Sequence, residues 1–210
     1  MTIAAKFLDL SHYDDVRDGF AGAVAFGIKG IVNKATEGPG MIDKTFAIRR
    51  PVAAKAGLLY GAYHFLRPGD QDQAAAHFLE TVGDPTGLHL MGDWEVPQVD
   101  VPTARQWFGA VHDKVGRWPS CYSYAAMLME NFGSKPDPSF AQLRLWVAQY
   151  GPQPHYPTQI WPTWWGWQFT GDGNGPEPHN VPGIVLVGSK GIDINAFNGT
   201  DDELAASWAA

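Results

Sequence analysis

Short apolar runs alternate with longer segments of helical periodicity up to about residue 140, and this alternation restricts the folds that the chain can adopt. The runs are typical of buried β-strands. The segments between them place apolar residues three and four positions apart, as on one face of a helix. Strands that alternate with helices favour β/α units and a parallel sheet. Beyond about residue 140 the helical segments end, and loops rich in Pro and Gly join the strands.

This pattern predicts about eight main strands, which is enough to close a barrel. They cover residues 3–10, 30–35, 58–65, 89–95, 119–124, 143–150, 163–169 and 191–195, and Val185 lies in a further short strand. The predicted helices cover residues 14–25, 43–56, 70–82, 103–115, 125–132 and 201–210. Thr103 and Gln106 have the spacing of a capping box at a helix start. Pro51 either kinks its helix or marks the first turn.

Composition excludes several classes of function. A chain of 210 residues can form one domain with a sizeable core, and no linker or repeat divides it. The formal net charge of −7 argues against a nucleic-acid partner. The single cysteine, Cys121, rules out an internal disulfide and a cysteine-based metal site. No apolar run reaches the ~18 residues of a membrane span, and the residues after Met1 do not form a signal-peptide pattern.

The segment 89–95 carries the clearest chemical signal, because this apolar run ends in Asp93 and Glu95. Side chains two positions apart in a strand project to the same face, so both carboxyls would share one space while Trp94 faces away. Like charges that close together raise one of the two pKa values. The pair would then offer a proton donor beside a carboxylate, as acid-assisted cleavage of a glycosidic bond requires. A solvated strand end is the structural alternative.

Polar and aromatic side chains also occur where the other predicted strands end. They are Asp9, Lys34 with Glu37, Tyr63 with His64, Tyr122, Gln149, Gln168 and Asp193. Because the carboxyl ends of parallel strands form the functional face of a barrel, these side chains should converge with Asp93 and Glu95. Carboxylates and amides bind hydroxyl groups, and aromatic rings stack on sugars. We therefore expect a carbohydrate site with acid chemistry at its centre.

Several of these residues also have a purely structural interpretation. Asp9 could cap a following helix, and Asp193 could belong to a turn. Lys34 and Glu37 could form an ion pair at the rim, and His64 could be a hydrogen-bonded histidine of the core. The four tryptophans between residues 161 and 167 are expected to divide between packing and ligand contact.

The chain carries seven short motifs, which are Phe7-Leu-Asp-Leu-Ser-His-Tyr13, Lys34-Ala-Thr-Glu-Gly38, Gly61-Ala-Tyr-His-Phe65, Asp93-Trp-Glu95, Leu145-Trp-Val-Ala148, Trp167-Gln168 and Asp193-Ile-Asn195. Through these motifs the chain resembles the glycoside hydrolase family 25 lysozymes, the N-acetylmuramidases of the Chalaropsis type. The motifs follow the family's order and cover nearly the whole chain. Pro51 departs from the pattern, since an uninterrupted helix is expected there. We also expect none of the wall-binding repeats that are attached to many relatives.

The resemblance implies an α/β fold, an irregular TIM-like barrel of five β/α units followed by three strands. Residues 1–210 would form a single catalytic barrel domain with no separate cell-wall-binding domain. The implied reaction is hydrolysis of the β-1,4 bond between N-acetylmuramic acid and N-acetylglucosamine in peptidoglycan, with retention of configuration. The resemblance implies no cofactor and no metal.

Roles for individual residues follow from the same resemblance. Glu95 corresponds to the family's general acid and Asp93 to the second carboxylate of the pair. Asp9 and Asp193 correspond to two further aspartates around the catalytic site, and Tyr63, Tyr122 and Gln168 are expected to bind the substrate. Two mechanisms stay open, because Asp93 either attacks the sugar directly or orients the substrate's own 2-acetamido group as an internal nucleophile.

Two other classes of function fit parts of the sequence. One is a barrel that binds peptidoglycan without cutting it, and the other is a metal-dependent polysaccharide hydrolase or deacetylase that uses Asp9, His12 and His64. For the muramidase, the expected partners are the glycan strands of peptidoglycan, with no nucleic acid and no membrane, and we expect a monomer. Without a signal peptide, the protein would be made in the cytoplasm and act on the cell wall after release, as a phage endolysin does, or after export by another route.

Overall fold

The computed structural model describes residues 4, 6–187 and 191–210. The main strands are β1 (Phe7–Leu10), β3 (Gly30–Glu37), β5 (Leu59–Phe65), β6 (His89–Asp93), β7 (Ser120–Tyr124), β8 (Leu145–Ala148), β9 (Gly166–Thr170) and β11 (Ile194–Phe197). Three shorter strands are β2 (Asp14–Val16), β4 (Met41–Ile42) and β10 (Ile184–Leu186). The helices are α1 (Ala21–Phe26), α2 (Thr45–Lys55), α3 (Gln71–Val82), α4 (Val101–Val115), α5 (Ala125–Phe132) and α6 (Asp201–Ser207).

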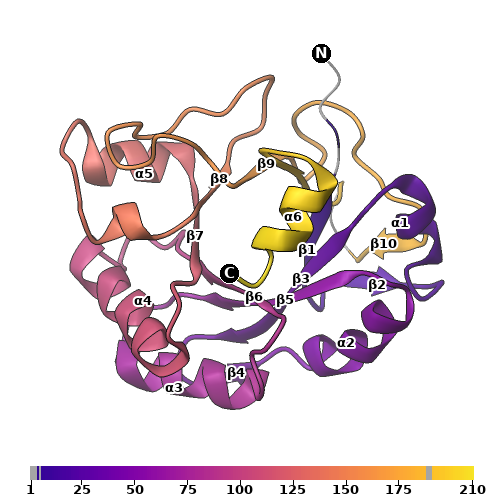
Figure 1. The fold of residues 1–210 in the computed structure, drawn as a ribbon, viewed down its shortest axis with the longest axis horizontal. Helices are drawn as coiled ribbons and strands as arrows, with labels where there is room; N and C mark the ends of the chain where they lie inside the picture. Colours follow the sequence, from indigo (N-terminus) through magenta and orange to yellow (C-terminus); the bar gives the residue numbers. More distant parts are fainter. Residues whose placement is uncertain (1–3, 5, 188–190) are drawn as a thin grey trace.

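The main strands close into a barrel, as predicted (Figure 1). Their order is β1-β11-β9-β8-β7-β6-β5-β3, and β3 pairs with β1 to complete the circle, while β4 extends the sheet beside β3. Neighbouring barrel strands run parallel except at β11, which is antiparallel to both β1 and β9. Helices α1 to α5 follow the early strands, and the last three barrel strands are joined by loops, which confirms the irregular TIM-like fold.

The core has an outer layer and an inner layer. The outer layer lies between the barrel and its helices and includes Leu90, Phe108 and Trp107. The inner layer fills the barrel with Phe7, Met91, Trp146 and other large side chains. These two layers follow from the alternation of side chains along each strand, because consecutive residues point to opposite faces.

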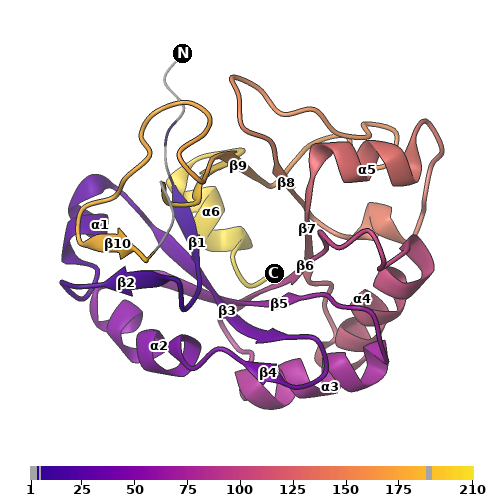
Figure 2. The same ribbon diagram turned by 180° about the vertical axis from the view of Figure 1, so that it is seen from behind.

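Helix α6 covers one end of the barrel; it lies in front of the strands in Figure 1 and behind them in Figure 2. Its C-terminal neighbour Trp208 is 1% exposed and donates its indole N–H to the carbonyl of Tyr60 at 2.7 Å. A side chain at Gly30 would begin 2.5 Å from the Trp208 ring, so only glycine leaves room for the indole there. The barrel is therefore closed at this end by packed aromatic rings, and the opposite end carries the candidate site.

The predicted helix over residues 14–25 is wrong in its first half. Residues Asp14–Val16 form β2, which pairs with β10 in a separate two-stranded sheet, and α1 begins only at Ala21. Gly19 and Phe20 have φ angles of 65° and 72°, in the left-handed region, which interrupts any helix that begins earlier. The short strand expected at Val185 is confirmed as β10.

The predicted capping box at Thr103 is also wrong. Helix α4 begins at Val101, and the Asp100 side chain accepts a hydrogen bond from the Thr103 backbone N–H at 2.9 Å. Pro102 is accommodated because the first turn of a helix needs no N–H donor at that position. Pro51 lies inside α2, and the helix continues through it to Lys55. Among the described residues, none of the helices has both the length and the apolar character of a membrane span.

Candidate active site

Four carboxyl side chains meet at the end of the barrel where the parallel strands finish. Asp9 lies in β1, Asp93 is the last residue of β6, and Glu95 follows two positions later. Asp193 precedes β11, which runs in the opposite direction, and the pairing of Leu8 with Ile194 brings it to the same end of the barrel as Asp9. Their charges affect one another: the charge of Asp9 raises the pKa values of the other three carboxyls, and the charge of Glu95 raises those of Asp93 and Asp193. We call these four residues the acidic ring.

A chain of hydrogen bonds fixes the orientation of Asp9. Gln168 donates Nε2 to Asp9 Oδ2 at 3.1 Å, and Asn195 donates Nδ2 to Asp9 Oδ1 at 2.7 Å. Tyr122 donates its hydroxyl to Gln168 Oε1 at 3.0 Å, and Trp146 donates Nε1 to Asn195 Oδ1 at 2.7 Å. Because both amide oxygens already accept these hydrogen bonds, the two amide NH₂ groups face the Asp9 carboxyl.

Asp93 and Glu95 differ in their access to solvent. Asp93 is 6% exposed, and its Oδ1 has no hydrogen-bond partner among the described residues, whereas Glu95 is only partly buried. Trp94 between them points into the outer core, where its Nε1 donates to the carbonyl of Val99 at 2.6 Å and its ring packs against Phe140. The sequence prediction that the two carboxyls share one side and Trp94 the other agrees with this arrangement.

Burial raises the pKa values of this pair, because a buried carboxyl loses the water that stabilises its charge. Burial, followed by the charges of Asp9 and Asp172, raises the pKa of Glu95 to about 7. Burial, followed by the charge of Glu95, raises the pKa of Asp93 well above its usual range, and the positive charge of Lys34 opposes this. The pair therefore holds protons near neutral pH.

The pKa values of the two other members of the acidic ring, Asp9 and Asp193, are raised as well. Burial raises the pKa of Asp9 to about 7, although the hydrogen bonds from Asn195 and Gln168 favour the charged form and limit the rise. Burial, followed by the charge of Asp9, raises the pKa of Asp193 well above its usual range. A site that retains protons at neutral pH can supply one to a leaving group.

Two hollows open beside the acidic ring. The first has a volume of about 340 Å³ and is lined by Glu95, Tyr124, Ala125, Ala126, Ala148, Gln149, Tyr150 and Gln168. The second has a volume of about 280 Å³ and is lined by Ser11, Tyr13, Asp14, Asp172, Leu186, Val187, Gly191 and Asp193. Glu95 faces one hollow and Asp193 the other, so a bound chain could extend across the acidic ring between them.

The side chains expected to bind substrate are close to the ring but largely buried. Tyr63 is 9% exposed, Tyr122 is 6% exposed and Gln168 is 1% exposed. Gln168 and Tyr122 are part of the hydrogen-bond chain to Asp9, and Gln168 also lines the first hollow. Their contact with a substrate stays a prediction.

Sequence patterns missed two residues of this site, Tyr150 and Asp172. A side chain at Gly171 would begin 2.2 Å from Asp193 Oδ1 and 2.5 Å from the Tyr150 hydroxyl, so both groups close on this glycine. Asp172 and Gly173 follow with φ angles of 52° and 74°, in a turn closed by the Gly171–Asn174 bridge. Asp-Gly is a recognised hairpin signal and could have located this turn, but not its place beside the acidic ring.

The structural interpretation holds for His64 and for the Lys34–Glu37 pair. His64 is fully buried, its Nδ1 lies 2.7 Å from the Thr36 hydroxyl, and its ring stacks on Trp107 at 5.1 Å between centroids. Lys34 forms an ion pair with Glu37, which Arg67 also contacts at 2.7 Å.

The residues proposed for a metal-dependent hydrolase do not form a ligand set. His12 Nδ1 pairs with Asp43 Oδ2 at 2.9 Å, whereas Asp9 is held by Gln168 and His64 lies in the core. Within the described part of the chain, no three His, Cys, Asp or Glu side chains are grouped so that they could hold a metal ion. This placement gives the metal-dependent alternative no support.

With this fold and acidic ring established, comparison with known proteins identifies the class. The model of the glycosyl hydrolases family 25 matches residues 8–177, and the chain belongs to this family. The uncharacterized protein YegX of Escherichia coli O157:H7 is 31% identical over 180 residues, which is 82% of this chain and 60% of YegX. The chain thus spans less than two thirds of that relative. Lysozyme M1 of Streptomyces globisporus is 25% identical over 228 residues, covering 98% of this chain and 71% of the lysozyme.

Solved structures agree with the family assignment. The bacterial lysozyme from Streptomyces coelicolor superimposes with a TM-score of 0.82 at 26% identity, covering 100% of this chain and 99% of the lysozyme. The catalytic domain of endolysin ply40 from bacteriophage P40 of Listeria monocytogenes has a TM-score of 0.70 at 17% identity over 100% of both chains, which shows a shared fold.

Proposed function

We propose that this protein is a muramidase that hydrolyses the β-1,4 bond between N-acetylmuramic acid and N-acetylglucosamine in peptidoglycan, with retention of configuration. The observation that carries the proposal is Glu95, a partly buried carboxyl with its pKa raised to about 7, which lines an open hollow beside Asp93. Family membership and the likeness to proteins called lysozymes support this reaction.

Glu95 is the general acid in this proposal. Of the Asp93–Glu95 pair, Glu95 is the more accessible carboxyl, and the raised pKa keeps a proton on it until a sugar binds. It gives that proton to the leaving glycosidic oxygen while the anomeric carbon gains positive charge. In the second half of the reaction the Glu95 carboxylate takes a proton from the water that attacks the same carbon.

Asp93 acts on the positive charge of the transition state. It is buried beside Glu95 and acts as the carboxylate, so a proton held on it is released to solvent as the sugar binds, and the positive charge that develops at the anomeric carbon stabilises the ionised form. Asp93 then either bonds to that carbon or orients the substrate's 2-acetamido oxygen to do so. Both routes retain configuration, since each replaces the leaving group twice at one carbon. The charges of Asp9 and Asp172 raise the pKa of Glu95 further, which helps keep Glu95 protonated.

The substitution Glu95→Gln tests this assignment. It keeps the size of the side chain but removes the proton, so lysis of purified sacculi should fall by about two to four orders of magnitude. Glu80→Gln, at an exposed position of α3, is the matched control and should lyse sacculi like the wild type. Circular dichroism would verify folding of both variants. Lysis by folded Glu95→Gln at the wild-type rate would disprove the role of Glu95.

A further inference from the structure

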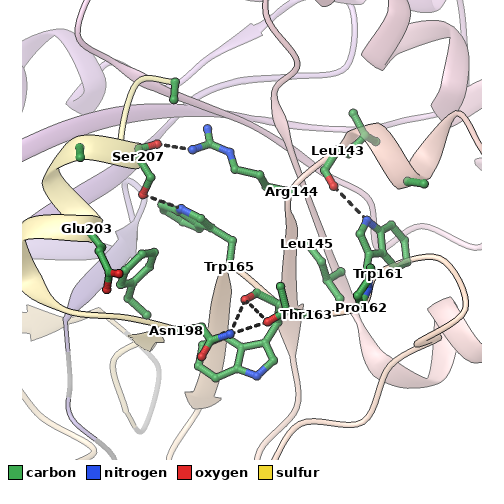
Figure 3. Close-up of a pocket in the computed structure, with 15 residues that line it drawn as sticks. Leu143, Arg144, Leu145, Trp161, Pro162, Thr163, Trp165, Asn198, Glu203 and Ser207 are labelled. Carbon is green, nitrogen blue, oxygen red and sulfur yellow. Dashed lines mark hydrogen bonds between the residues drawn. The ribbon is translucent and has the colours of Figure 1, made fainter.

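A basic side chain lies near each end of the barrel. At the end covered by α6, Figure 3 shows the guanidinium of Arg144 reaching Ser207, whose carbonyl accepts a hydrogen bond from it. The central carbon of this guanidinium lies 5.2 Å from the centre of the Trp165 ring, so Arg144 contributes to the packing of that end. At the open end, the ammonium of Lys34 lies close enough to Asp93 for its charge to act on this member of the acidic ring. The second cation is therefore placed to affect the chemistry.

A β-bulge in β3 determines where Lys34 points. Lys34 pairs with Tyr63 of β5, and Thr36 pairs with the next residue of that strand, His64. Ala35 is therefore an extra residue that has no partner of its own in β5. A bulge of this kind shifts the alternation of side chains by one position and re-aims the side chains beside it.

The bulge brings Lys34 and Glu37 to the same face of β3. Lys34 follows Val32 by two positions, and Val32 belongs to the inner layer of the core, so Lys34 also points into the barrel. Thr36 points outward, because its hydroxyl lies 2.7 Å from Nδ1 of His64, whose ring stacks on a side chain of α4. Glu37 comes next and points inward again, whereas residues three positions apart in a regular strand lie on opposite faces.

The Lys34 ammonium is held between a carboxylate and an aromatic ring. Its Nζ pairs with Glu37 Oε2 and lies 4.8 Å from the centroid of the Phe65 ring. The other oxygen of Glu37, Oε1, accepts a hydrogen bond from Arg67 Nε at 2.8 Å. The Lys34 side chain is only 8% exposed. Its positive charge is therefore fixed in place and is screened less by salt and water than a charge at the surface.

Phe65 also relates this cation to Asp93. Phe65 pairs with Asp93 across β5 and β6, and residues paired in this way project to the same face of a sheet. The positive charge of Lys34 opposes the rise in the pKa of Asp93, whereas burial and the negative charges of Asp9 and Asp172 all raise the pKa of Glu95. Lys34 thus acts differently on two carboxyls that are two positions apart.

The other titratable groups that interact with Asp93 through their charge are acidic. They are Glu95 after β6, Asp9 of β1, Asp193 before β11, Tyr63 of β5, and Tyr122 and Cys121 of β7. Each of them is neutral or negative, so none of them stabilises a carboxylate at Asp93 by its charge. Lys34 supplies the opposite charge to this surrounding.

We propose that Lys34 is a positioning residue that keeps Asp93 ionised during the reaction, so that this carboxylate acts together with the protonated Glu95. The inference rests on the proposed function, because it assigns Lys34 a part in that reaction. When a sugar binds, the proton on Asp93 leaves to solvent, and the ammonium stabilises the carboxylate that remains. Glu37 fixes the ammonium in place but offsets part of its charge.

Carbon-13 nuclear magnetic resonance of the side-chain carboxyls tests the effect without relying on catalysis. The Asp93 signal would be assigned with Asp93→Asn, and its titration midpoint followed in each variant. Lys34→Gln should move this midpoint to higher pH by about one unit, the effect of losing one nearby opposite charge. Glu37→Gln should move it to lower pH, because the charge of Lys34 is then no longer offset.

The opposite directions separate an electrostatic role from a structural one. Either substitution breaks the same ion pair, so a merely structural pair predicts shifts in the same direction or no shift. Lys34→Gln leaves Glu37 paired with Arg67, and circular dichroism would verify the folding of both variants. Midpoints that do not move, or that move in the same direction, would overturn the proposal, even in a protein that proved to have no muramidase activity.

The acid limb of the pH–activity profile gives a second test. Lys34→Gln should move this limb to higher pH and lower kcat about tenfold on the acidic side, with KM nearly unchanged, and Lys34→Arg should restore the limb because it keeps the charge. Lys29→Gln is the matched control, since Lys29 precedes the opposite end of β3 and its Nζ lies 3.4 Å from Asp201. Coincident acid limbs in folded Lys34→Gln and Lys29→Gln would refute the role of Lys34, while activity of the wild type tests the muramidase proposal separately.

Discussion

Asp93 and Glu95 follow from the same strand end, but their surroundings differ and suit them to the two different roles proposed above. Asp93 is enclosed, with one oxygen that has no partner among the described residues, and Glu95 lines an open hollow. A buried group can respond to charge that develops nearby, whereas a proton donor must reach the atom that it protonates. Accessibility rather than pKa alone therefore distinguishes the two carboxyls.

The charge of Asp172 should affect the pKa of Glu95. Its negative charge is among the causes that raise the pKa of Glu95, so Asp172→Asn should lower that pKa. Since the proposed mechanism requires a protonated Glu95, the alkaline limb of the pH–activity profile should move to lower pH, by less than about one unit. Asp202→Asn, at an exposed position on α6, is the control and should leave the profile in place. An alkaline limb that does not move in Asp172→Asn would show that this charge does not reach Glu95.

At the scale of elements, β11 shows how a reversed strand completes the site. Its antiparallel direction places its beginning, rather than its end, beside the carboxyl ends of the parallel strands. Asp193 precedes this strand, and Asn195 within it bonds to Asp9. The loops that replace helices after α5 allow this reversal, since a parallel connection would require a long crossover.

Helix α6 should contribute to stability although it lies far from the acidic ring. Trp208→Ala removes an indole that packs against Phe7, His89 and Trp165 and bonds to the Tyr60 carbonyl. The free energy of unfolding, measured with urea, should fall by about 3–5 kcal/mol. Trp118→Ala, at a partly exposed indole stacked on His112, is the control and should cost less. Equal losses in the two variants would contradict the role of α6 as the closure of the barrel.

Sequence patterns located most barrel strands to within a few residues, because apolar runs bounded by Gly and Pro are strong strand signals. They failed at Asp14–Val16, whose partner β10 lies far along the chain and leaves no local trace. They also identified Gln168 only as a polar residue near the end of a strand. Its hydrogen bonds to Asp9 and Tyr122 depend on the barrel, which brings three strands together. Local patterns indicate elements, but contacts between distant elements decide how a side chain is used.

For the whole molecule, the protonated acidic ring predicts how stability depends on pH. The pKa values of Asp9 and Glu95 are raised to about 7 and that of Asp14 to about 6, mainly by burial. Between about pH 4 and pH 7 these carboxyls hold protons that the unfolded state loses. The buried histidines His64 and His89, with lowered pKa values, act in the opposite direction but are outnumbered by the carboxyls, so stability falls as pH rises. The slope should be about 1.4 kcal/mol per pH unit for each extra proton bound.

Urea unfolding at several pH values measures this dependence. The native protein should be more stable at pH 5 than at pH 8, and Glu95→Gln should show a smaller loss over the same interval because it removes one of the protons concerned. Stability that increases steadily from pH 5 to pH 8 would contradict the protonated state of the acidic ring.

Mass spectrometry of purified sacculi digested with the protein determines whether the acidic ring cuts the glycan on the muramic acid side of the linkage, as we propose. We predict soluble muropeptides with new reducing N-acetylmuramic acid ends, and none from sacculi treated with Glu95→Gln. Reducing N-acetylglucosamine ends, or intact glycan with sugars that have lost only their acetyl groups, would contradict it.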